Sequence, residues 1–304
     1  TVTASSITIS GADAGNYTLA TTSRTTTANI TPATVTLSAI KVYDGSTSLT
    51  GFVTVTGVAG QTLNYTSATS SDANVGTSSK YIKTITLANN GSVLASNYTL
   101  PTLNSSNAPV TINQLSSVTW IGASTGSWGT ASNWTNGITP TTAVGSLIPN
   151  VATVYVGGNT ISINIANIAG NIVSNNATLT VSSTSLVLPT LNITGPVKLG
   201  SGITTTGSQT YNEAVTLNTN IALITTNSDV TFNQTVNSDG TARTLSVSTG
   251  NGNVNFNGDV GNVSQLSNIT INTNQLTANN ITPVSYTHLR AHETGRNLVC
   301  RLLL

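Results

Sequence analysis

Residues 211–260 read YNEAVTLNTNIALITTNSDVTFNQTVNSDGTARTLSVSTGNGNVNFNGDV, and one short pattern occurs three times within them. An aromatic residue, an Asn, two variable residues and a Val follow one another at 211–215, 232–236 and 256–260. The aromatic residues are 21 and 24 positions apart. Short strands that recur every ~20–25 residues are typical of a solenoid, in which each repeat forms one coil. Because no helix-period pattern lies between the copies, this stretch predicts a parallel β-helix.

The Asn of each copy has a predicted structural role. In a parallel β-helix, equivalent residues of successive coils stack ~4.8 Å apart. Asn212, Asn233 and Asn257 are therefore expected to form an amide ladder along the solenoid. Since Asn tolerates the left-handed conformation, we also expect it to mark the corner of each coil. A bend after Asn212 would let Glu213 face water while Tyr211 and Val215 stay inside.

The pattern extends less regularly over 114–283, where apolar residues alternate at Ile161, Ile163 and Ile165 and again at Leu179 and Val181. At this period, 114–283 could make about seven coils. The low charge of the chain, 6% of its residues, suits such a stack because equal charges on neighbouring rungs repel.

Residues 1–113 have a different, strictly alternating pattern. Apolar residues alternate with Thr at 34–37, 53–56 and 84–87, and turn signals such as Asn90-Gly91 separate these runs. This alternation is typical of half-buried strands with Thr on the solvent face. The sequence Asn-Tyr-Thr-Leu occurs at both 16–19 and 97–100. We therefore predict an all-β repeat at 32–113, and the C-terminal part of a truncated preceding repeat at 1–31.

Three motifs of this half carry a family resemblance. Lys41–Gly45 (KVYDG), Asp72–Gly76 (DANVG) and Asn97–Leu100 (NYTL) occur in that order. They resemble the YDG and MBG-type repeats of large bacterial haemagglutinin-like exoproteins. The resemblance implies a small β-sandwich-like (or β-grasp-like) module that serves as a repeated spacer.

The motif Tyr43-Asp44-Gly45 permits two interpretations. It could contact a ligand, or it could be a turn in which Asp accepts local hydrogen bonds, Gly takes positive φ and Tyr packs at the strand end. The residue types favour the turn.

All three Trp residues lie within 120–134, which reads WIGASTGSWGTASNW. This segment resembles the one that opens passenger β-helices in autotransporter- and filamentous-haemagglutinin-like proteins, and the later aromatic-Asn-x-x-Val copies resemble the repeats of the same proteins. The resemblance implies a right-handed parallel β-helix over 114–283 with an N-terminal cap at 114–150. Trp120, Trp128 and Trp134 are expected to plug the open end of the solenoid; the alternative is a glycan-binding site built on exposed ring faces.

Composition excludes several other functions. Nine scattered Lys and Arg residues do not make a nucleic-acid interface, and no apolar run approaches the ~20 residues of a membrane helix. One Cys excludes a disulfide framework and a Cys-rich zinc site. We predict no catalytic, metal or cofactor-binding residues, because the acidic residues of the second half occupy non-equivalent positions: Glu213, Asp229, Asp239 and Asp259. A β-helical polysaccharide lyase or hydrolase is kept as a further alternative.

Residues 284–304 differ in composition from the rest. They contain both His, the only Cys and three of the five Arg residues. The segment resembles translated sequencing-adapter read-through at the end of a metagenomic reading frame, which predicts a non-native tail.

Taken together, the resemblances imply a non-enzymatic structural or adhesive segment of a large secreted bacterial surface exoprotein. Such a segment would pass an outer-membrane pore by two-partner or autotransporter secretion and remain at the cell surface. Its expected partners are host-cell or abiotic surfaces, with glycans as a further class, and no cofactor is expected. The scarcity of Cys suits that route, since a periplasmic disulfide would obstruct passage through the pore.

Overall fold

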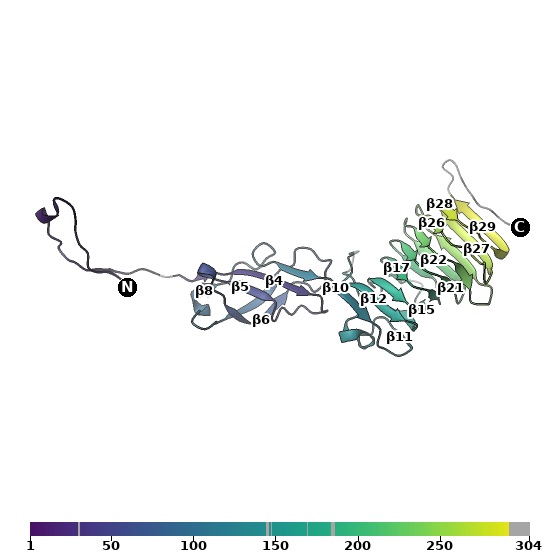
Figure 1. Ribbon diagram of the computed structural model, residues 1–304, viewed down its shortest axis with the longest axis horizontal. Helices are drawn as coiled ribbons and strands as arrows, with labels where there is room; N and C mark the ends of the chain where they lie inside the picture. Colours follow the sequence, from purple (N-terminus) through teal and green to yellow (C-terminus); the bar gives the residue numbers. More distant parts are fainter. Residues whose placement is uncertain (30, 144–145, 147, 169, 184–185, 292–304) are drawn as a thin grey trace.

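The computed structural model describes residues 1–29, 31–143, 146, 148–168, 170–183 and 186–291, the last nine through their backbone. The described chain is nearly all β and consists of an extended N-terminal arm, a small module and a parallel solenoid, arranged end to end (Figure 1). The all-β prediction and the predicted right-handed parallel β-helix are confirmed.

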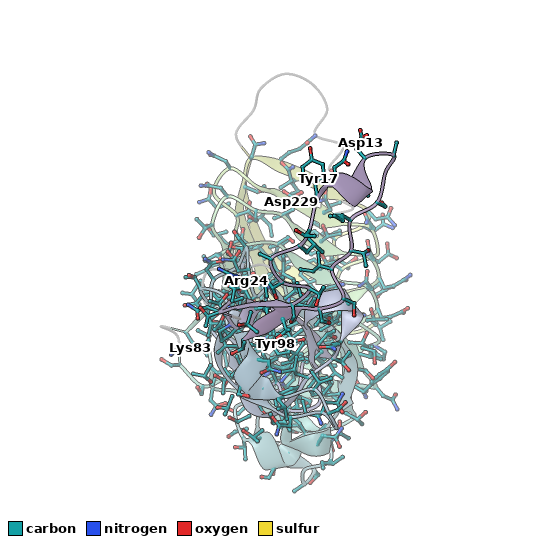
Figure 2. All side chains as sticks on the ribbon, turned by 90° about the vertical axis from the view of Figure 1, so that its left-hand side faces the viewer. Asp13, Tyr17, Arg24, Lys83, Tyr98 and Asp229 are labelled. Atoms are coloured by element: carbon teal, nitrogen blue, oxygen red, sulfur yellow. The ribbon has the colours of Figure 1, made fainter. Side chains whose placement is uncertain are left out.

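The arm, residues 1–29, contains the antiparallel pair β1 (Val2–Ala4) and β2 (Arg24–Thr26) and the 3₁₀ turn η1 (Ala14–Asn16). Tyr17 follows this turn and is 70% exposed (Figure 2). Its counterpart Tyr98 follows a matching turn, η3 (Ala95–Asn97), but packs against the core. The two copies of Asn-Tyr-Thr-Leu thus share their local structure and differ in their tertiary contacts.

The small module contains three sheets, one of them mixed. Strand β4 lies between the antiparallel β5 and the parallel β9; β6 and β7 form a hairpin, and β3 pairs with β8. The elements are β3 (Ala33–Thr34), β4 (Thr36–Val42), β5 (Val53–Thr56), η2 (Val58–Gly60), β6 (Asn64–Ser70), β7 (Ile82–Ala88), β8 (Tyr98–Thr99) and β9 (Val110–Asn113). Burial alternates strictly along β4, which is the predicted period of two.

The solenoid is built from three parallel sheets and makes about six turns. The first sheet contains β10 (Leu115–Thr119), β12 (Val151–Gly157), β14 (Asn171–Ser174), β17 (Leu191–Thr194), β20 (Gln209–Tyr211), β23 (Val230–Phe232), β26 (Asn253–Phe256) and β28 (Gln275–Ala278). The second contains β11 (Thr125–Ser127), β13 (Thr160–Ile163), β15 (Ala177–Val181), β18 (Val197–Leu199), β21 (Val215–Leu217) and β24 (Val236–Ser238). The third contains β16 (Val187–Leu188), β19 (Ile203–Thr205), β22 (Ile221–Thr225), β25 (Thr244–Ser248), β27 (Leu266–Thr273) and β29 (Pro283–Ala291).

Sequence periodicity predicted about seven coils, and the solenoid makes about six turns of unequal length, of which the first is the longest. Leu115 pairs with Val151, so 36 residues separate equivalent positions there. The extra chain forms the short 3₁₀ turns η4 (Ala131–Asn133) and η5 (Thr135–Gly137), which belong to the predicted cap. Later coils match the short period: Tyr211 pairs with Phe232, and Phe232 with Phe256.

The last strand extends past the predicted end of the β-helix at residue 283. The backbone of β29 pairs in parallel with β27 and so continues the third sheet. An open strand edge offers backbone hydrogen bonds to any sequence, whatever its origin. The non-native origin of 284–304 therefore stays a prediction from composition. Residues 292–304, which include His292 and Cys300, lie outside the described residues.

Candidate functional site

The amide ladder predicted from the repeat is present on the outside of the first sheet. Asn233 Nδ2 donates to Asn212 Oδ1 at 3.0 Å, and Asn257 Nδ2 donates to Asn233 Oδ1 at 2.8 Å. Asn212 Nδ2 continues the series by donating to Asn192 Oδ1 at 2.8 Å. Each amide in the middle of the ladder is therefore both donor and acceptor.

The left-handed corner predicted for these Asn residues is wrong. None of the three has positive φ, whereas Asn176 and Asn227 elsewhere in the solenoid do. The reason is that the ladder residues still belong to the parallel backbone pairing, which requires extended φ: Asn233 N–H donates to the Tyr211 carbonyl at 2.9 Å. The chain bends after them, between β20 and β21, and Glu213 faces water as predicted.

A second ladder, of aromatic rings, runs along the face of the first sheet that lines the core of the solenoid. The Tyr211 and Phe232 rings stack with centroids 4.9 Å apart and an interplanar angle of 9°, and Phe232 and Phe256 stack at 4.9 Å and 4°. All three side chains are fully buried. Each of the three Asn residues predicted for the amide ladder directly follows an aromatic residue of the second ladder at the end of its strand, so one register error would break both ladders.

The coil that contains Tyr211 also carries a buried polar pair. Gln209 is fully buried, and its Oε1 accepts a hydrogen bond from the Tyr211 hydroxyl at 3.0 Å. Gln209 Nε2 donates to the carbonyl oxygens of Ile203 and Ile224, each at 3.1 Å. Burial raises the pKa of Tyr211 far above its ordinary range, so this hydroxyl remains a donor.

Sequence reasoning missed a third ladder, made of buried Thr residues at the end of the third sheet. Its members are Thr205, Thr225, Thr249 and Thr273. The Thr249 hydroxyl donates to the Gly252 carbonyl at 2.8 Å and is hydrogen-bonded to Thr273 Oγ1 at 2.7 Å. In each coil the hydroxyl bonds a carbonyl two or three residues ahead, where the chain turns toward the first sheet. The available signal was a Thr two residues after an inward-facing Ile, Leu or Val.

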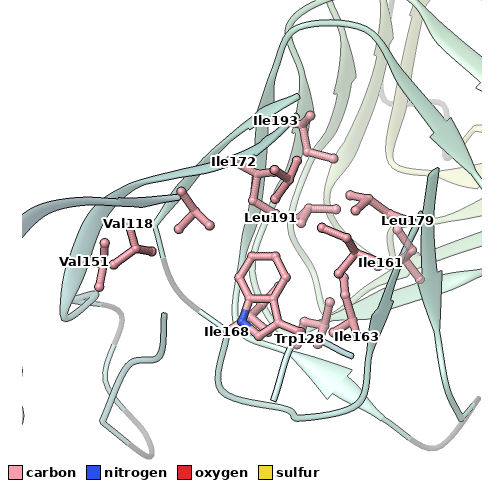
Figure 3. Close-up of a cluster of buried hydrophobic side chains, with 14 of the residues drawn as sticks. Val118, Trp128, Val151, Ile161, Ile163, Ile168, Ile172, Leu179, Leu191 and Ile193 are labelled. Atoms are coloured by element: carbon pink, nitrogen blue, oxygen red, sulfur yellow. The ribbon is translucent and has the colours of Figure 1, made fainter. Parts of the chain in front are cut away.

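The Trp cluster is buried at the N-terminal end of the solenoid. Trp128 and Trp134 are 0% exposed and Trp120 is 6% exposed. Trp134 packs edge-on against both others, at centroid distances of 5.1 and 4.9 Å. Figure 3 shows the Trp128 indole beside Ile163 and Ile168.

Each indole N–H donates to a carbonyl oxygen: those of Ala123, Pro140 and Trp128. The glycan-binding alternative at Trp120, Trp128 and Trp134 requires exposed ring faces, and these rings are buried. Their position and burial fit the predicted cap instead.

The Tyr43-Asp44-Gly45 motif has the geometry of a turn. Tyr43 is buried, Gly45 has φ 78°, and Asp44 Oδ1 accepts from the Ser46 N–H at 2.9 Å. The buried Lys41, whose ammonium role sequence reasoning missed, donates to Asp44 Oδ1 at 2.6 Å and to the carbonyls of Ser46 and Ser48 at 2.9 Å. Partial burial acts to raise the pKa of the Asp44 carboxyl, but the hydrogen bonds from Lys41 and Ser46 have the larger combined effect. The net result is a pKa below the ordinary value of an Asp carboxyl.

The acidic residues of the solenoid take part in separate loop contacts. Asp239 forms a two-pronged ion pair with Arg243, with distances of 3.0 and 2.8 Å, and this pairing lowers the pKa of the Asp239 carboxyl. Asp229 accepts from the Asn253 N–H at 2.7 Å, and Asp259 accepts from the amides of Asn279 and Asn280. Within the part of the chain that the structure describes, no three His, Cys, Asp or Glu residues gather as metal ligands.

Comparison of the chain with protein-family models, with curated proteins and with solved structures finds no match. Among the described residues, no helix has the length and apolar character needed to cross a membrane. The class defined by the fold is thus that of parallel β-solenoid repeat proteins.

Proposed function

We propose that this chain is a non-enzymatic structural and adhesive segment of a large secreted bacterial surface exoprotein. In this role the solenoid and the small module hold a contact surface away from the cell. The partners are host-cell or abiotic surfaces, and an outer-membrane pore delivers the chain to its surface location.

One observation carries the proposal: three ladders run along the solenoid axis, and the small module continues the chain lengthwise (Figure 1). Every coil is bonded to its neighbours by backbone and side-chain hydrogen bonds along that axis. A repeat stack of this kind grows in length by adding coils, because each repeat contacts only its neighbours. Length and stiffness are the properties that a surface spacer requires.

The outer face of the ladder supports an adhesive role through repetition. Ranks of Asn and Thr side chains present the same uncharged donors and acceptors on successive coils: Thr210, Thr231, Asn255 and Thr277 in one rank, and Asn212, Asn233 and Asn257 in the next. Each contact with a foreign surface would be weak, but many contacts on one rigid rod add by multivalency.

The proposal is tested by displaying the full chain on a non-adherent bacterium and measuring attachment to epithelial cells and to polystyrene under flow. The control displays an unrelated folded protein of similar mass at equal density. Attachment above this control on at least one surface is expected. Attachment equal to the control on both surfaces, with display verified by antibody, contradicts the adhesive role.

A separate assay addresses the non-enzymatic part. The purified chain is incubated with neutral and uronate-containing polysaccharides, with and without calcium, and new reducing ends and unsaturated products are measured. No turnover is expected. Turnover that follows the folded protein through purification would assign a lyase or hydrolase activity instead.

A further inference from the structure

The Asp72–Gly76 turn, singled out by its sequence, is held in a fixed shape from within its own module. Asp72 Oδ1 accepts from the Asn74 N–H at 2.6 Å and from Asn74 Nδ2 at 3.0 Å. On the other side, the buried Lys80 ammonium donates to the carbonyls of Val75 and Thr77. These internal contacts leave the Val75 N–H and the Asn74 side-chain oxygen available to a partner outside the module.

These two groups meet a single side chain of the solenoid, Asn150. Asn150 Oδ1 accepts from the Val75 N–H at 2.7 Å, and Asn150 Nδ2 donates to Asn74 Oδ1 at 2.7 Å. One donor and one acceptor on the turn thus match the acceptor and donor of one carboxamide. Asn150 is 0% exposed, so both hydrogen bonds are shielded from water.

Asn150 is itself fixed inside the solenoid. Its N–H donates to the Thr141 carbonyl, and its carbonyl accepts from Leu115 N–H at the start of β10, each at 2.9 Å. Next to it, Gln114 Nε2 donates to the Pro149 carbonyl at 2.8 Å, which ties down the connection between the two modules. The carboxamide therefore projects from a rigid base.

Gly76 completes the contact by allowing close approach. A Cβ at this position would clash with the Ser146 side chain and lie 3.2 Å from the Ile148 carbonyl oxygen. Gly76 does not have positive φ, so its own backbone would accept a larger residue. The absence of a side chain at residue 76 is required by the neighbouring module and not by the turn.

We infer that the Asp72–Gly76 turn is a docking element that recognises the Asn150 carboxamide and locks the small module and the β-helix into one rigid unit. The element is independent of adhesion: it fixes the geometry of the joint whatever surface the chain contacts. The joint is specific because a charged or apolar residue at 150 would leave Val75 N–H or Asn74 Oδ1 without a partner.

The test measures the distance between spin labels on the two modules by pulsed electron paramagnetic resonance. Labels are attached at Lys83→Cys and Glu213→Cys, both exposed positions, in the full chain with Cys300→Ser (Figure 2 shows Lys83). Two variants disrupt the joint, one in each module. Asn150→Leu removes the carboxamide from the solenoid side, and Gly76→Leu adds a side chain that blocks the close approach from the side of the turn. Each has a matched control: Asn167→Leu, whose amide bonds Thr142 within the solenoid, and Ser78→Leu, an exposed position of the same loop.

The parent and both controls are expected to give one narrow distance distribution. Asn150→Leu and Gly76→Leu are expected to lose it and give a broad distribution, with unchanged circular dichroism. Narrow distributions in both folded variants would overturn the proposal. If Asn150→Leu fails to fold, Gly76→Leu decides, since it adds atoms only at the joint.

Discussion

The Tyr211 hydroxyl and the Gln209 side chain are both fully buried and are joined by a 3.0 Å hydrogen bond. In the next coil the same two positions are Val230 and Phe232, and in the following coil Val254 and Phe256. The phenol and the amide therefore occur together or not at all. A buried hydroxyl without a partner costs far more than one that is satisfied, which gives the physical reason for the pairing.

A double-mutant cycle tests this pairing. Tyr211→Phe leaves Gln209 Oε1 unpartnered, and Gln209→Val leaves the Tyr211 hydroxyl unpartnered, so each single change should destabilise by about 1–3 kcal/mol. The double variant has Val and Phe at these two positions, as the next coil has in Val230 and Phe232. Its loss of stability should be smaller than the sum of the losses of the two single variants. The measurement is the free energy of unfolding in denaturant; strictly additive losses would show that the two side chains do not depend on each other.

Alkaline stability should depend on the same tyrosine. In the unfolded chain a tyrosine titrates near its ordinary pKa of 10.0, while burial raises the pKa of Tyr211 in the folded state. Above pH 10 unfolding therefore releases a proton from Tyr211. The contribution of Tyr211 to the free energy of unfolding is fully present below pH 10 and falls as the pH rises further. Comparison of unfolding free energies across this range should give a smaller alkaline loss for Tyr211→Phe than for the parent. If the free energy of unfolding falls equally steeply with pH in the parent and in Tyr211→Phe, the burial of an un-ionised hydroxyl is contradicted.

The amide ladder predicts an order of stabilities among three neighbouring Asn residues. Asn233→Ala removes two side-chain hydrogen bonds of the ladder and should lower the free energy of unfolding by about 1–3 kcal/mol. Asn257→Ala removes one such hydrogen bond and should cost about half as much. Asn255→Ala is the matched control, because its amide makes only a 3.4 Å contact with Thr231 on the adjacent rank. Thermal or denaturant unfolding ranks the three, and an effect of Asn255→Ala as large as that of Asn233→Ala would refute the ladder as a source of stability.

The buried Thr ladder should be sensitive to loss of a hydroxyl at constant shape. Thr249→Val keeps the branched side chain but loses the bonds to the Gly252 carbonyl and to Thr273, which should destabilise by about 1–3 kcal/mol. Thr210→Val on the outer face of β20 is the control and should be nearly neutral, since its side chain is only half-buried. Chemical unfolding compares the two, and equal behaviour of both variants would show that the inner hydroxyls contribute nothing.

The Trp cap predicts a spectroscopic result and a stability result. With all three indoles buried, tryptophan emission should be blue-shifted and poorly quenched by acrylamide in the folded chain. Trp128→Ala should cost about 3–5 kcal/mol, because it removes a fully buried ring beneath the first coils, while Trp128→Phe should cost less. Free quenching of the folded protein would show that the rings are exposed and would reopen the glycan-binding alternative.

Several features of this fold were readable from local sequence. Alternation with Thr predicted the strands of the small module, and the spacing of Tyr211, Phe232 and Phe256 predicted the length of each coil. The Asn ladder followed from the same spacing, because equal periods place equal residues above one another. These features depend on period and residue type, both of which are visible in one dimension.

Other features required the folded chain, because their partners come from distant segments or from an unexpected face. The Trp-rich segment alone is compatible with rings that point inward or outward. In the folded chain all three rings are buried, and Trp128 lies beside Ile163 and Ile168 (Figure 3). Asn212 and its equivalents do not take positive φ, because their backbone N–H groups are bonded to the preceding coil, which intrinsic Asn preference does not reveal. Asn150 and Val75 are 75 residues apart and share no motif.

The amino-acid sequence by itself thus determined the all-β class, the coil period and the alternating apolar residues that face the core, since those follow from patterns repeated along the chain. Only the tertiary structure decided which buried polar groups are paired, where the Trp rings lie and how the two modules join. The physical reason is that a hydrogen bond or a packed ring is satisfied by whatever group lies beside it in space, and that neighbour is fixed only when the coils stack.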